Sequence, residues 1–111
     1  MDKLAQYRQA VKQLLTEQFC PTTPDEPVQE QLIFDEERDH YQLAYVGWQG
    51  NKRVFGPVLH CDIQAGKIWV QYNGTESMVA QRLVEMGVAP SDIVLGFHSE
   101  FKRQFTPYAV H

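Results

Sequence analysis

The chain has 111 residues, 43% of them hydrophobic, which is enough for one domain whose core needs no disulfide or metal. Fourteen acidic and ten basic residues give a net charge of −4 and a pI of about 5.5, so the overall field repels a polyanion and disfavours autonomous DNA binding. No apolar run approaches the roughly 18 residues of a membrane span.

The two cysteines, Cys20 and Cys61, lie far apart and show no CxxC spacing. This usage predicts reduced thiols in a cytoplasmic protein, with a pair between the two left as an alternative. The N-terminal segment carries Asp2 and Glu17 and reads as an amphipathic helix, not as a signal peptide.

The first predicted element is a helix over residues 4–19, where apolar side chains recur with a period near 3.6. Asp2 can cap its start, and Pro21 prevents its continuation. Residues 20–27 contain three prolines and form a linker to the sheet.

Four strands are predicted over residues 31–35, 40–48, 53–63 and 68–72, joined by three short turns. Short connections favour an antiparallel meander with the helices packed on one face. Gly56 and Pro57 interrupt the third strand, so we expect a bulge or bend there.

The segment after the fourth strand predicts a second helix and a short fifth strand. We expect Thr75 to cap the helix, with Glu76 in its first turn, and Gly87 to end it so that Val88 folds back on Leu83. Residues 93–95 form an apolar run that suits a buried strand. The crossover from residue 72 to residue 93 is long enough to make this strand parallel to the fourth.

The last segment, residues 97–111, matches no element clearly. Its aromatic residues Phe101, Phe105 and Tyr108 need cover, so we expect a tail packed across the domain, with contact to another subunit as the alternative. The sequence therefore predicts one α+β domain over residues 1–111, with an N-terminal helix, a four-stranded antiparallel meander, a second helix, a short fifth strand and a packed C-terminal tail.

The triplet of His60, Cys61 and Asp62 is the first candidate for chemistry. Adjacent strand residues point to opposite faces, so Cys61 should not meet His60. The thiol is expected in the core, on the same face as Phe55, Leu59 and Ile63, whereas His60 and Asp62 share the other face.

Two sets of residues extend this pair. The first is a candidate polar or ligand site made of His60, Asp62, His98 and Arg103. The second is the site of a small metal-dependent hydrolase, made of His40, His60, Asp62 and His98. The short-range ligand pairs typical of metal motifs are missing. A hydrogen-bonded structural histidine is therefore favoured, and we expect no metal, no cofactor and no catalytic residue.

The basic residues Lys52, Arg53, Lys102 and Arg103 support a second alternative, direct DNA binding. Ordinary surface charges are the favoured interpretation. Aromatic residues make up 12% of the chain, which suits a protein-binding face. The candidate contacts are Tyr45, Trp48, Phe105 and Tyr108.

The chain resembles the XisI family, the fdxN-element excision controlling factors, in colinear blocks along essentially its whole length: MDKLAQYRQAV, QLIFDEERDHYQLAYVGWQG, RVFGPVLHCDI, KIWVQYNGTE, LVEMGV, DIVLGFH and KRQFTPYAV. Cys61, Glu100 and His111 depart from the family pattern, in which an aliphatic residue, a proline and a small residue are usual. The resemblance implies a small α+β accessory factor for excision of a DNA element by a site-specific recombinase, acting with a companion protein, XisH. It implies no catalytic residues.

The leading hypothesis is accordingly a non-enzymatic regulatory protein that binds a XisH-like partner, with a homo-oligomer as a further option. The rivals are the metal-dependent hydrolase and the DNA-binding protein.

Overall fold

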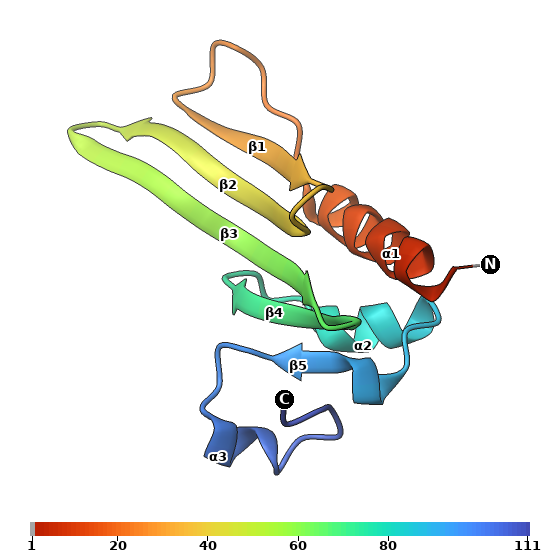
Figure 1. Ribbon diagram of the computed structural model, residues 1–111. Helices are drawn as coiled ribbons and strands as arrows, with labels where there is room; N and C mark the ends of the chain where they lie inside the picture. Colours follow the sequence, from red (N-terminus) through yellow and green to blue (C-terminus); the bar gives the residue numbers. More distant parts are fainter. Residues whose placement is uncertain (1) are drawn as a thin grey trace.

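Five strands form one sheet in the sequential order β1-β2-β3-β4-β5 in the computed structural model, which describes residues 2–111 (Figure 1). The first four strands are antiparallel, and β5 runs parallel to β4, as the length of the crossover predicts. In chain order the elements are α1 (Lys3–Gln18), β1 (Val28–Asp35), β2 (His40–Gln49), β3 (Lys52–Gln64), β4 (Lys67–Asn73), α2 (Val79–Glu85), a 3-10 turn (Pro90–Asp92), β5 (Ile93–Leu95) and α3 (Glu100–Arg103). The α+β fold class is confirmed.

Helices α1 and α2 pack on the same face of the sheet, and the hairpin of β2 and β3 extends beyond both (Figure 1). The Asp2 carboxylate accepts a hydrogen bond from the Leu4 N–H, so the predicted cap of α1 is confirmed. The buried face of α1 joins the inner face of the sheet in one core, which includes Val11, Leu14, Leu15, Tyr41, Leu43, Leu59, Cys61, Ile68 and Val70. None of the helices in the described part of the chain is long and apolar enough to cross a membrane.

Strand β1 begins three residues earlier than its sequence predicts, at Val28 rather than Gln31. The added residues pair with the segment Tyr45–Gly47 of β2. Two of these residues, Gln29 and Glu30, are polar and give no strand signal in the sequence. They pair nonetheless, because the hydrogen bonds between strands come from the backbone and need no apolar side chain.

A bulge in β3 reverses part of the predicted side-chain alternation. Leu59 pairs with Leu43 and Pro57 pairs with Ala44, so Val58 is an extra residue. The interruption expected at Gly56-Pro57 is confirmed. The expectation that Phe55 shares the core face with Leu59 and Cys61 is wrong, because the extra residue turns Phe55 to the opposite face, where it is 73% exposed.

The start of α2 also differs from its prediction. Thr75 does not cap the helix; its N–H and hydroxyl both donate to the Asn73 side chain, forming a turn before the helix begins. Met78 occupies the cap position without a side-chain hydrogen bond. The end of α2 is as predicted, since Gly87 has a φ of 100° and the Val88 N–H donates to the Leu83 carbonyl.

The C-terminal tail contains a short helix that the sequence analysis missed. Ser99 caps α3 by accepting from the Lys102 N–H, and the Ala109 N–H donates to the Ile93 carbonyl, which ties the tail to the edge of β5. Tyr108 packs against the core. Phe101 and Phe105 are not covered within the chain: they contact each other edge to face and remain 69% and 74% exposed, and their contact with another subunit stays a prediction.

The bulge generates a stability prediction. Leu59→Ala should lower the free energy of unfolding by about 2–5 kcal/mol, because Leu59 is fully buried and truncation leaves a cavity. Phe55→Ala should change it by less than about 1 kcal/mol, because Phe55 loses contact mainly with the exposed Arg53. Urea unfolding of both variants tests this, and a large loss in Phe55→Ala would contradict the reversed alternation.

Candidate functional site

The face of the sheet opposite α1 and α2, here called the open face, carries a polar cluster at its centre. Tyr41, Leu43 and Cys61 point into the core beneath the helices. Their neighbours in the strands therefore point the other way, which brings His40, Gln42, His60 and Asp62 to the open face. The register of β2 and β3 also places these side chains next to each other, because His40 is the cross-strand partner of Asp62 and Gln42 that of His60.

Asp62 is the centre of this cluster. Its Oδ1 lies 2.8 Å from His40 Nδ1 and 2.7 Å from His60 Nε2, and its Oδ2 accepts from Gln71 Nε2 at 3.2 Å. The other ring nitrogen of His60, Nδ1, is 2.8 Å from Gln42 Oε1. The carboxylate is thus buried and fully engaged, whereas half of the His40 side chain faces solvent.

Burial by itself would raise the pKa of Asp62, but the hydrogen bonds from His40 and His60 outweigh it, so the pKa lies below the usual range of a carboxyl group. Asp62 therefore carries its negative charge at neutral pH. This charge sits on the open face in direct contact with two imidazoles, an arrangement that can hold a proton or a cation.

The structure divides the residues of the predicted polar site. His60 and Asp62 lie together with His40, but His98 and Arg103 belong to the tail. The His98 ring stacks beside Phe97, and Arg103 donates to the carbonyls of His98 and Val110. The His98 side chain therefore does not join the cluster, and Arg103 serves to hold the tail.

Two members of the cluster escaped the sequence analysis. Gln42 could have been found, because it lies two residues from His40 in the same strand and must share its face. Gln71 could have been found in the same way, because it follows the core residue Val70 and must point to the opposite face. The bulge between Val70 and Tyr72 instead changes the direction of Tyr72, which pairs with His60 on the open face.

The cysteines take no part in the cluster. Cys61 is fully buried in the core, and burial raises the pKa of its thiol to about 12. Cys20 is exposed, and both thiols are free. The expected core position of Cys61 is confirmed, and a thiolate nucleophile is excluded at this position.

The predicted basic set is also divided. Lys52 and Arg53 lie at the tip of the β2–β3 hairpin, whereas Lys102 and Arg103 lie in and at the end of α3. The Arg53 guanidinium lies over the rings of Trp48 and Phe55, and that of Arg103 lies over Trp69. The four cations do not form one surface.

Large apolar side chains also stand on the open face, on either side of the polar cluster and toward the tip of the β2–β3 hairpin. They are called the open-face patch here: Ile33, Trp48, Phe55 and Tyr72, each 47–73% exposed. Ile33 and Tyr72 stand at the two ends of the cross-strand row that passes through Gln42 and His60.

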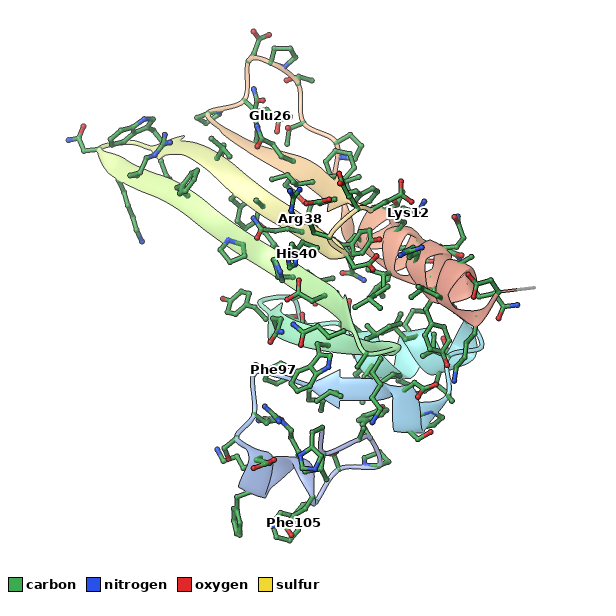
Figure 2. The ribbon with its side chains drawn as sticks, in the orientation of Figure 1. Lys12, Glu26, Arg38, His40, Phe97 and Phe105 are labelled. Atoms are coloured by element: carbon green, nitrogen blue, oxygen red, sulfur yellow. The ribbon has the colours of Figure 1, made fainter. Side chains whose placement is uncertain are left out.

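The four predicted partner contacts lie in different places. Trp48 belongs to the open-face patch, whereas Tyr45 is on the opposite face of β2 and Tyr108 packs against the core. Figure 2 shows Phe105 at the end of the molecule away from the hairpin tip. The sequence did not predict the other members of the patch as contacts. Phe55 was assigned to the core face because the bulge at Val58 is not visible in the sequence. Ile33 and Tyr72 have the character of ordinary core residues of their strands.

Comparisons with known proteins agree with this architecture. The family model of the XisI protein matches residues 1–110. A XisI-like protein from Anabaena variabilis is 48% identical, with a TM-score of 0.90 over 97% of this chain and 99% of that chain. The fdxN element excision controlling factor XisI of the same organism is 34% identical, with a TM-score of 0.90 over 99% of this chain and 100% of that one. No curated protein matches the chain.

The different environments of the two thiols predict one reactive cysteine per folded chain. A chromogenic disulfide reagent at pH 8 should modify Cys20 rapidly and Cys61 only after unfolding, because Cys61 is both inaccessible and protonated. Cys20→Ser should leave no fast phase. Two fast-reacting thiols in the native protein would contradict the buried position of Cys61.

The lowered pKa of Asp62 predicts a pH-dependent contribution to stability. A group whose pKa is lower in the folded state stabilises the fold above its unfolded pKa, near about 3.9, and loses this contribution as the pH falls. The wild type should therefore exceed Asp62→Asn in unfolding free energy at pH 7, and the difference should shrink below about pH 5. Urea midpoints measured from pH 7 to pH 2.5 test this. A difference that stays constant with pH would show that the carboxylate is not preferentially stabilised in the fold.

Proposed function

Because this chain belongs to the XisI family, we propose that it acts as a non-enzymatic accessory factor in the excision of a DNA element, by binding a protein partner. The support for the process comes from the relative of known structure that is named an fdxN element excision controlling factor. The proposed partner is a XisH-like protein in the cytoplasm. The chain would contribute a binding surface, and the partner or the recombinase would contribute the chemistry.

The observation that carries the proposal is the open-face patch. Its aromatic side chains stand on a strand framework that neither α1 nor α2 covers, so they can be buried by a partner with little rearrangement. Trp and Arg are the side chains that most often dominate binding energies, and here Arg53 is stacked on Trp48 and Phe55. This combination of exposed aromatic side chains and a stacked arginine suits a protein contact.

Electrostatics favour protein over DNA as the partner. The chain carries a net charge of −4, and the four basic residues of the DNA-binding hypothesis are split between the hairpin tip and the tail. A duplex would have to be held by few phosphate contacts against an unfavourable overall field. The DNA-binding hypothesis therefore has weaker support than the partner-binding one.

The hydrolase hypothesis loses one of its four residues, although His40, His60 and Asp62 lie together. It requires His98 beside His40, His60 and Asp62, whereas the His98 ring lies against Phe97 in the tail. The remaining three residues lie on the open face of a sheet, with His40 half in solvent. Such a site offers little exclusion of water around a substrate.

Binding to the partner generates the central prediction for this function. Trp48→Ala and Phe55→Ala should each weaken binding of a co-expressed XisH-like protein at least tenfold in calorimetry, because each removes a large apolar side chain from the proposed interface. Phe105→Ala is the matched control, since Phe105 is the same residue type with nearly the same exposure, 74% against 73%. It should bind within about twofold of the wild type.

The same series separates the alternatives. Loss of affinity in Phe105→Ala with Phe55→Ala unaffected would move the contact to the tail and refute the open-face patch. No complex with the partner, together with self-association abolished by Trp48→Ala in sedimentation, would replace the XisH-like partner by a second copy of this chain. Circular dichroism of each variant establishes that folding is intact.

A further inference from the structure

We propose that His40, His60 and Asp62 form a binding site for a divalent cation of the zinc class on the open face of the sheet. The site is distinct from the partner contact proposed above and requires no partner. It is built from strands β2 and β3 alone, at the centre of the sheet.

The donor atoms already converge. His40 Nδ1, His60 Nε2 and Asp62 Oδ1 lie within 4.8 Å of one another, and the oxygen is within 2.8 Å of both nitrogens. Tetrahedral zinc with bonds of about 2.0–2.1 Å places its ligand atoms about 3.3 Å apart. Small side-chain rotations that separate the carboxylate from the two imidazoles would therefore open a position for the ion.

The backbone fixes this convergence. His40 and Asp62 are cross-strand partners in an antiparallel pair, and His60 and Asp62 are two residues apart on one strand. All three side chains must leave the same face of the sheet in neighbouring positions. The ligands are thus held by the ladder rather than by a flexible loop, which lowers the entropic cost of binding.

A supporting shell surrounds the donors. His60 Nδ1 contacts Gln42 Oε1, and Asp62 Oδ2 accepts from Gln71 Nε2. Metal-binding imidazoles commonly use their second nitrogen in such a contact, and metal-binding carboxylates are likewise hydrogen-bonded. In this site both glutamines would fix the orientation of the ligands without touching the ion.

The donor set selects the class of cation. Two imidazoles and one carboxylate suit zinc and neighbouring transition metals, whereas magnesium and calcium prefer oxygen donors. Asp62 supplies a carboxylate oxygen and its negative charge to the donor set. Half of the His40 side chain is exposed, which leaves room for water as the fourth ligand.

Calorimetric titration of the chelator-treated full-length protein with zinc chloride tests the proposal. The Cys20→Ser variant is the reference protein, because the exposed Cys20 thiol is a potential zinc ligand of its own. We expect one zinc ion per chain with a dissociation constant in the micromolar range or below. His60→Gln and Asp62→Asn should each weaken binding at least tenfold, and Gln42→Ala, which removes a positioning residue, should weaken it about tenfold.

Two control variants address adventitious binding. His111 lies beside Glu100 in an exposed pair, and His98 lies in the tail, so His111→Gln and His98→Gln should leave zinc affinity within twofold. Titration with cobalt chloride gives a second readout, in which the visible absorption of tetrahedral Co²⁺ should appear in the reference protein and disappear in His60→Gln. Circular dichroism of the metal-free variants separates a lost ligand from a lost fold.

The outcomes are decisive in either direction. Tight binding that depends on His60 and Asp62 but not on His98 or His111 supports the site. Absence of binding, binding unchanged in His60→Gln and Asp62→Asn, or binding lost in His111→Gln overturns it. Failure of zinc binding would leave the partner-binding function untouched, because the partner experiment uses Trp48 and Phe55.

Discussion

The bulge at Val58 is the constraint on which the two faces of this sheet depend. A single extra residue in β3 lets Leu59 and Cys61 face the helices while Phe55, only four residues before Leu59, faces the other way. The second bulge, at Gln71, does the same for β4: Val70 enters the core, whereas Tyr72, two residues later, pairs with His60 on the open face. Without these two bulges, strict alternation would bury the wrong side chains in half of each strand.

Interactions between elements far apart in sequence then decide how much of the sheet is covered. Arg8 of α1 forms a bidentate salt bridge with Asp39 of the β1–β2 turn, and Arg82 of α2 forms another with Glu17 of α1. Helix α1 is therefore joined both to this turn and to α2. On the other face the tail covers the β4 and β5 end, where Arg103 lies over Trp69. The open face of β2 and β3 receives neither cover, which leaves the open-face patch and the histidine–aspartate cluster on the same uncovered face.

The sequence predicts the elements well wherever local chemistry determines them. The cap at Asp2, the reversal at Gly87 and the short strand of residues 93–95 depend on residues a few positions apart, and all are confirmed. The polar half of β1, the start of α2 and the four-residue helix of the tail depend on pairing and packing with distant segments, and they were misplaced or missed. The candidate site follows the same division. His60, Asp62 and Gln71 reach the open face by alternation, whereas the position of Tyr72 beside His60 depends on a bulge and the position of His98 depends on the path of the tail.

If a protein partner binds the open face, the side chains that it contacts on this chain should lie there. Mapping these side chains is the most direct measurement. Nuclear magnetic resonance of the chain with labelled methyl and aromatic groups, titrated with an unlabelled XisH-like protein, would report the contact side chain by side chain. The account predicts that the signals of Ile33, Trp48, Phe55 and Tyr72 change together while those of Phe101 and Phe105 stay in place. A footprint confined to the tail, with the open-face patch unperturbed, would contradict it.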